Sequence, residues 1–350
     1  MRNKILPVEY PPITTYPIIA NIFAVLWHKK EQVLPWFADH YIQLHATGHE
    51  GGAMWFNFYD ADFLYKIHPA DYCPYLLTQQ IDKSSFNRAN FCFTNFIEEQ
   101  INNDYYIITH LNQYFLPCSY HYNVRNSMHP TFIYGYNNDQ KIIHMSDFYD
   151  DKKYKSKTAT FDEINQSYNF DHLETDAPQA FYGITLYKFV KSRYKTNINL
   201  LKQTLEDYIE GKDSTRRYFH SVQFQFTNSQ TDNSDYGINC YNMLAKHINY
   251  CKEKGDWPDV RPFHLLYDHK VAMKIRLNYL VDNNYINNKE KDRLLLLCDK
   301  LINSTLAFRN LALKHQVQSD SKTLVALYES CQSIQKFDLE FTTKFMQALK

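Results

Sequence analysis

The most informative part of this sequence is His129-Pro-Thr-Phe-Ile-Tyr-Gly-Tyr136, followed by Lys141-Ile-Ile-His-Met-Ser-Asp147. A tight polar turn, Asn137-Asn138-Asp139, separates the two apolar runs, and this pattern predicts a β-hairpin. In such a hairpin, His129 and Asp147 lie at the same end of the sheet, one strand apart. A histidine that is oriented by an aspartate is the base half of a nucleophilic catalytic triad.

The composition excludes several classes of function. The 350 residues include 38 Lys and Arg against 38 Asp and Glu, so the formal net charge is zero and no binding to nucleic acid or to an anionic membrane is expected. No apolar run approaches the roughly 18 residues of a membrane span. The seven cysteines are scattered and form no CxxC pair, which predicts free thiols. Because the N-terminus also has no secretory signal pattern, the expected location is cytoplasmic.

The chain is predicted to form two domains, residues 1–195 with mixed α and β structure and residues 196–350 with helices. A buried helix is expected at 18–27, with Thr14 or Thr15 as its N-cap and Pro17 in its first turn. Thr160 and Glu163 form a capping-box pattern before a short helix. Other predicted segments are helices at 32–45, 161–168, 199–209, 238–252, 260–282, 287–316 and 320–348, and strands at 104–109, 113–116, 131–136, 140–146 and 183–190.

The region around His129 and Asp147 resembles a known protein family. The sequence Tyr120-x-Tyr122, the run that begins at His129, and Met145-x-Asp147 resemble the papain-like superfamily, in particular the butirosin-biosynthesis protein H N-terminal-like domains, which are related to bacteriocin-leader peptidases. The resemblance covers roughly residues 10–190. It implies an α+β fold of the papain-like cysteine-peptidase type, with a helical lobe and an antiparallel sheet, followed here by a C-terminal helical domain. It also implies that His129 is the base and that Asp147 orients it.

The family's nucleophile is a cysteine at the start of the buried first helix, where the helix dipole stabilises a thiolate. In this chain the equivalent position falls on or next to Tyr16, and no cysteine is present there. Three alternatives remain open. Thr14 or Thr15 could act as a hydroxyl nucleophile, Cys118 could act as a thiol nucleophile, or Tyr16 could donate a proton in a non-covalent reaction.

No metal or cofactor is expected. His45 and His49 are four residues apart, but the neighbouring glycines Gly48 and Gly51 predict a loop, and no phosphate-binding glycine motif occurs. One predicted helix also carries charged residues that are expected to form ion pairs between the two domains, or alternatively to face an acidic phosphopantetheine arm. These residues are Arg261, Asp268, Lys270 and Arg276.

The resemblance implies an accessory protein of peptide-type natural-product biosynthesis, with acyl-transfer or amide-bond chemistry on a carrier-tethered substrate. Its expected partner is a carrier protein or a peptide synthetase. One alternative is an inactive papain-like pseudoenzyme that binds the carrier-tethered peptide or the synthetase. Another is a cysteine peptidase with an atypical nucleophile.

Overall fold

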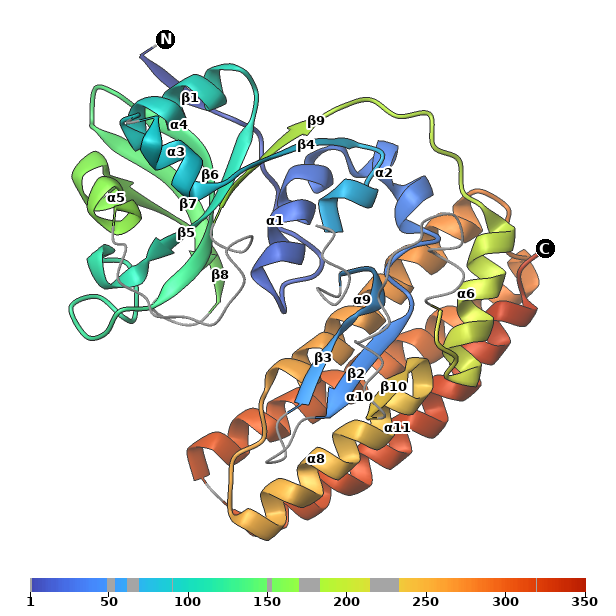
Figure 1. Cartoon of the computed structure of the whole chain (residues 1–350). Helices are drawn as coiled ribbons and strands as arrows, with labels where there is room; N and C mark the ends of the chain where they lie inside the picture. Colours follow the sequence, from blue (N-terminus) through green and yellow to red (C-terminus); the bar gives the residue numbers. More distant parts are fainter. Residues whose placement is uncertain are drawn as a thin grey trace. The chain divides into compact units, whose positions relative to one another are not determined.

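A computed structural model describes residues 2–48, 54–61, 69–89, 91–149, 153–169, 183–214, 233–318 and 320–350. The protein is α+β, with an antiparallel sheet and a helical C-terminal region (Figure 1). The chain divides into two compact units. Unit 1 comprises residues 1–30 and 69–193, and unit 2 comprises residues 31–68 and 194–350.

Unit 1 is built on an antiparallel sheet with the strand order β4-β9-β5-β6-β7-β8, and β1 pairs with β6 as well. The strands are β1 (Asn3–Ile5), β4 (Leu76–Ile81), β5 (Tyr106–Asn112), β6 (Met128–Asn137), β7 (Ile142–Phe148), β8 (Tyr154–Thr160) and β9 (Ile184–Phe189). The helical elements of this unit are α1 (Pro17–Leu26), η1 (Trp27–Lys29), η5 (Pro69–Tyr72), α3 (Lys83–Arg88), α4 (Phe93–Asn102), η6 (Gln113–Phe115) and α5 (Phe161–Tyr168).

The predicted hairpin is confirmed as β6 and β7, with Phe132 opposite Ser146 and Ile133 opposite Met145. A bulge between Ile133 and Gly135 shifts the register. At Gly135 the strand β1 approaches so closely that a Cβ atom would lie 3.0 Å from the backbone of Ile5. A side chain at this position would therefore push β1 away from the sheet.

The two faces of this sheet are covered by different helices (Figure 1). Tyr136 is opposite Ile143 on β7 and donates a hydrogen bond to Asn102 of α4. Tyr154 is opposite Phe148 on β7 and donates to Asn21 of α1. Because side chains alternate along a strand, positions 143 and 148 point to opposite faces. Helix α4 therefore covers one face and α1 covers the other.

Helix α5 agrees with the sequence in both its bounds and its cap. The Thr160 hydroxyl accepts from the Glu163 N–H at 3.2 Å, and the Glu163 carboxylate accepts from the Thr160 N–H at 2.7 Å. At α1 the prediction is wrong by one or two residues, because Tyr16 is the N-cap residue and makes no side-chain cap. Pro17 occupies the first turn as expected, where the missing N–H has no cost.

Unit 2 contains long helices and a small antiparallel sheet with the order β10-β2-β3. Its elements are α2 (Lys30–Phe37, of which Lys30 falls in unit 1), β2 (Leu44–Gly48), β3 (Met54–Phe58), η3 (Tyr59–Ala61), α6 (Ile198–Glu210), β10 (Ser234–Tyr236), η8 (Gly237–Asn239), α8 (Cys240–Lys254), α9 (Arg261–Asp282), α10 (Asn288–Gln318) and α11 (Ser321–Gln347). The helices after residue 195 lie where the 3.6-residue pattern places them. Within the described ranges, none is long and apolar enough to cross a membrane.

Two predicted segments are wrong. The helix predicted at 32–45 ends at Phe37, and His45 lies on β2, because the buried Asp39 carboxylate accepts from the Asn197 N–H and the Tyr194 hydroxyl. The strand predicted at 113–116 is the short 3-10 helix η6, which begins where the Asn112 side chain accepts from the Tyr114 N–H. In both places a polar side chain binds backbone or side-chain donors. The partners of Asp39 are distant in sequence, whereas the cap by Asn112 is local.

The grouping of residues 31–68 also differs from the sequence-based boundary at 195. Unit 1 ends at residue 193, close to the predicted boundary at 195. However, the segment from α2 to η3 belongs to unit 2, together with the C-terminal helices. The reason is its contacts: β2 pairs with β10, and the Arg276 guanidinium of α9 donates to the carbonyls of Phe37 and Ala38. Carbonyls at the end of a helix have no partner within the helix, so a buried cation satisfies them.

Candidate active site

His129 and Asp147 lie in contact at one end of the sheet of unit 1. His129 is the second residue of β6, and Asp147 is next to last on β7. The distance between His129 Nδ1 and Asp147 Oδ1 is 2.5 Å. The Asp147 side chain is fully buried, whereas the His129 side chain retains 30% of its exposure. Because Nδ1 faces the carboxylate, Nε2 is the nitrogen with which the ring can act on another molecule.

The buried Asp147 carboxylate is held by further donors. The Thr131 hydroxyl donates to Oδ2 at 3.1 Å, and Gln113 Nε2 donates to the same oxygen at 3.2 Å. The Phe148 N–H donates to Oδ1 at 2.7 Å. A buried carboxylate needs such partners, and these contacts fix the orientation of the Asp147 side chain.

The electrostatics of the site suit a general base. Burial favours a low pKa for His129, but the negative charge of Asp147 and the contact between the two groups outweigh it, so that the pKa is raised above its ordinary value of 6.5. His110 on the neighbouring strand has a different environment. Its burial, together with the charge of His129, lowers its pKa to about 4. At neutral pH, His110 is therefore neutral, whereas the pKa of His129 is shifted in the opposite direction.

Gln113 and Thr131 are functional neighbours that the sequence analysis missed. Thr131 could have been found, because strand alternation puts residues 129 and 131 on one face. Gln113 could not, because it follows the end of β5 and reaches Asp147 only through the fold.

The residues proposed around the nucleophile position lie at the start of α1. Thr15 and Tyr16 are buried, and Thr14 is half-buried. The first turns of α1 lie at the same end of the sheet as the dyad, since Asn21 is bonded to Tyr154, which pairs with Phe148. However, Asp147 lies four residues after Ile143 on β7 and so points to the face that α4 covers. The start of α1 and Asp147 thus share an end of the sheet but belong to different faces.

Cys118 lies in the loop after η6 and interacts electrostatically with Asp147. Burial raises the pKa of its thiol to about 11, and the negative charges of Asp147 and Glu163 add to this effect while Lys157 opposes it. The thiolate is the nucleophilic form of cysteine, so Cys118 at rest is a neutral thiol at physiological pH. If Cys118 reacts, a base must remove its proton in the course of the reaction.

No group of three or more potential metal ligands occurs among the residues that the structure describes. His45 is fully buried on β2, where its ring stacks on Tyr236 at 4.9 Å between ring centroids. His49 lies outside the described residues.

The charged residues of α9 have roles inside unit 2. Lys270 is fully buried and bonds to Asp338 of α11 at 2.5 Å, and Arg276 is buried against the carbonyls that follow α2. Arg261 is exposed and pairs with Asp259, while Asp268 lies 3.6 Å from His264. The partners in these contacts all belong to unit 2, so none of these contacts is an ion pair between the two units.

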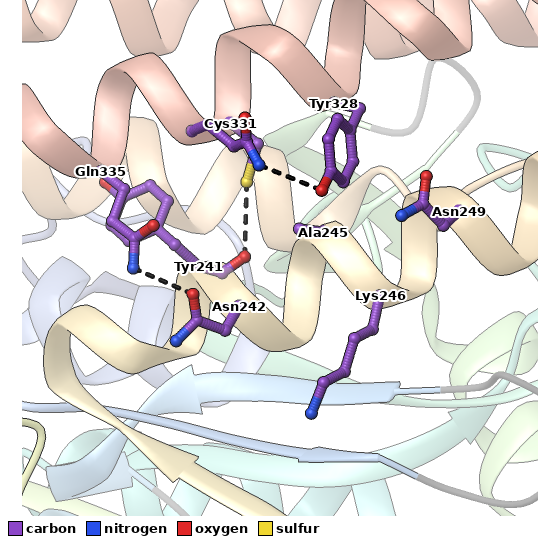
Figure 2. A pocket seen from close by; sticks show the side chains of 9 residues that line it. Tyr241, Asn242, Ala245, Lys246, Asn249, Tyr328, Cys331 and Gln335 are labelled. Carbon is purple, nitrogen blue, oxygen red and sulfur yellow. Dashed lines mark hydrogen bonds between the residues drawn. The ribbon is translucent and has the colours of Figure 1, made fainter.

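Unit 2 also has a small hollow of about 180 Å³ between α8 and α11 (Figure 2). Its lining is mostly polar: Tyr241, Asn242, Ala245, Lys246, Asn249, Tyr328, Cys331, Gln332 and Gln335. Several of these groups bond to one another, as Gln335 does to Asn242 at 3.2 Å and Gln332 to Tyr328 at 3.0 Å. Burial raises the pKa of the Cys331 thiol to about 12, so the hollow offers no ready nucleophile.

The geometry of unit 1 therefore defines a histidine–aspartate dyad on an antiparallel sheet, with no cysteine at the start of the neighbouring helix. In comparisons with models of protein families and with curated proteins, nothing matches this chain.

Proposed function

We propose that unit 1 carries a papain-like site for acyl transfer or amide-bond chemistry, in which His129 is the general base and Asp147 orients it. The observation that carries this proposal is the 2.5 Å contact between His129 Nδ1 and the buried, multiply bonded Asp147. A histidine held in this way presents Nε2 as a base, and the charge of Asp147 raises its pKa above the ordinary value. The half-exposed ring is accessible to a substrate.

In the proposed step, a hydroxyl or thiol of the protein attacks the acyl carbon of a thioester. His129 takes the proton of the nucleophile, and a bond forms between the nucleophile and the acyl carbon. The carbon–sulfur bond to a phosphopantetheine arm then breaks, and the proton passes to the departing sulfur. An amine or water releases the acyl group in a second step.

The sequence resemblance supports the substrate class, a peptide-like or amino-acyl group carried on a carrier protein or a peptide synthetase. The candidate nucleophiles are Cys118, Thr14 and Thr15, and Tyr16 is the candidate donor of a proton in a non-covalent version. Thr14, Thr15 and Tyr16 precede α1, which covers the other face of the sheet from Asp147. Cys118 is the first to test because it lies near enough to Asp147 for that charge to act on its thiol.

The test is intact-protein mass spectrometry after incubation with an acyl-loaded carrier protein, and separately with the N-acetylcysteamine thioester of the same acyl group. An added acyl mass, located by peptide mapping, is expected in the wild type and in His144→Ala, a control on the same hairpin. It should be absent from His129→Ala. Single changes of Cys118→Ser, Thr14→Val, Thr15→Val and Tyr16→Phe identify the reacting group. If neither acylation nor turnover occurs between pH 6 and 9, the enzyme proposal is wrong.

A second candidate is a binding protein that retains the dyad without covalent chemistry. Two observations favour it: Tyr16 occupies the helix start where a cysteine would act, and the pKa of Cys118 is raised. In that case, calorimetry should show that the wild type and His129→Ala bind an acyl-loaded carrier equally well, with no acyl mass added to either.

A further inference from the structure

The side chain of Gln113 connects the dyad to a neighbouring loop. It is buried, and its amide nitrogen donates to Asp147 Oδ2 at 3.2 Å and to the Phe148 carbonyl at 3.3 Å. Its amide oxygen accepts from the Ser119 hydroxyl at 3.0 Å. Ser119 in turn accepts from the His121 N–H at 3.0 Å. A continuous chain of hydrogen bonds therefore runs from the loop to the Asp147 carboxylate.

The loop in question is formed by residues 116–127, which connect η6 to β6. Both of its ends are fixed, because the Gln113 N–H donates to the Ser127 carbonyl and the Ser127 N–H donates to the Asn112 side chain. Between these ends the loop exposes large side chains, among them Tyr120 and Val124. Ser119 thus ties the exposed part of the loop to the buried Gln113.

We infer that Gln113 is a positioning residue, which holds the Asp147 carboxylate against His129 and couples it to the 116–127 loop through Ser119. The other donors to Asp147, Thr131 and the Phe148 N–H, belong to the same hairpin as the dyad. Gln113 comes from outside this hairpin, so its hydrogen bond fixes the carboxylate relative to another part of unit 1. A role of Gln113 in catalysis rests on the proposed function, whereas its role in holding the Asp147 carboxylate does not.

The titration of His129 reports this positioning without any substrate. Its pKa depends on burial and on the charge and contact of Asp147. If the carboxylate turns away, burial dominates and the pKa falls. The other titratable groups that interact with the dyad come from β5, the loop, the segment after β7 and β8: His110, Cys118, Tyr149 and Tyr154. Lys157 of β8 and Glu163 of α5 interact with Cys118. Because Gln113 and Ser119 carry no charge, changing them alters none of these charges directly.

The experiment is an NMR titration of the full-length protein with ¹³C-labelled histidine, in which His129→Gln assigns the signal. Gln113→Met keeps the shape of the side chain but removes its hydrogen bonds, and Asp147→Asn gives the limit without the carboxylate charge. The pKa of His129 should fall in Gln113→Met toward its value in Asp147→Asn, and should fall less in Ser119→Ala. Gln140→Met, on the exposed hairpin turn, is the matched control and should leave the pKa unchanged.

An unchanged pKa of His129 in Gln113→Met, with an intact circular dichroism spectrum, would overturn the inference. If Gln113→Met does not fold, Ser119→Ala decides the question in the same way. The two proposals can fail separately. A lowered pKa with no acyl transfer by the wild type retains the positioning role and rejects the enzyme. Acyl transfer with an unchanged pKa in both variants retains the enzyme and rejects the role of Gln113.

Discussion

Lys270 Nζ on α9 lies 2.5 Å from Asp338 Oδ2 on α11, and both side chains are buried inside unit 2. The Tyr208 and Tyr241 hydroxyls donate to the same carboxylate, at 2.6 and 3.0 Å. Such a pair joins two helices through charge in the interior of unit 2. Its stability depends on both partners, because either charge alone would be left without compensation.

Removal of Asp338 should therefore destabilise the protein strongly. We expect Asp338→Ala to lower the free energy of unfolding by about 3–5 kcal/mol, as measured by urea denaturation, because Lys270 remains buried without its counter-ion. Lys274 and Asp299 provide a matched control, since they also lie 2.5 Å apart but are 39% and 47% exposed. Asp299→Ala should cost at most about 1 kcal/mol. Equal losses in the two variants would contradict this account of burial.

The proposed reaction should depend on pH through His129. The base must be neutral to accept a proton, so the rate should rise with pH through a pKa above 6.5. In Asp147→Asn the raising influence is lost while burial remains, so the midpoint of the pH–rate profile should move to lower pH. His129→Ala should reduce the rate by about 10²–10⁴-fold, the usual contribution of a general base. A profile that keeps its midpoint in Asp147→Asn would show that the dyad does not control the rate.

The dyad should also influence stability in a pH-dependent way. A histidine whose pKa is raised by folding stabilises the folded state below its unfolded pKa, and this contribution is lost as the pH rises through the folded value. The difference in urea midpoint between the wild type and His129→Gln should therefore be largest near pH 6 and should shrink toward pH 9. If the difference in urea midpoint instead grew with pH, the predicted stabilisation by His129 would be contradicted.

The cysteines should differ in reactivity. Cys92 is exposed, and its pKa is lowered by the Thr94 hydroxyl and nearby N–H groups, whereas the pKa of Cys118 is raised by burial. Limiting iodoacetamide at pH 7.5 should modify Cys92 first, and peptide mapping can locate the label. In Cys92→Ser, labelling of Cys118 should remain slow. Faster labelling of Cys118 than of Cys92 would reveal an activated thiol and would strengthen its assignment as the nucleophile.

The cap of α5 can be tested directly. Thr160→Ala removes one half of the capping box and should reduce the free energy of unfolding by about 1 kcal/mol, whereas Thr160→Ser keeps the hydroxyl and should have little effect. Urea denaturation of both variants provides the comparison. Equal losses would assign the effect to the methyl group of threonine instead of to the cap.

Local signals in the sequence predict much of this fold. The hairpin with His129 and Asp147, the capping box at Thr160 and the long helices after residue 195 each depend on patterns within a few neighbouring residues. These elements occur where they were expected, and the hairpin brings His129 and Asp147 into contact.

The features that escaped prediction depend on distant partners. Helix α2 stops early because Asp39 is bonded to residues about 155 positions away, and β2 exists because β10 pairs with it. Gln113 reaches the Asp147 carboxylate across 34 residues. No window of local sequence contains such relationships, so the role of Gln113 becomes visible only in three dimensions.

The division of unit 2 between residues 31–68 and 194–350 has a consequence for biosynthesis. On the ribosome, the strand β2 emerges long before β10 and before Arg276, the residues that pair with it and bond to the end of α2. During that interval, every strand of the sheet of unit 1 except β1 is synthesised. The early segment must therefore wait without its partners while unit 1 folds around its own sheet, and a nascent chain that stops at residue 195 would present β2 to chaperones with the edge unpaired that β10 later covers.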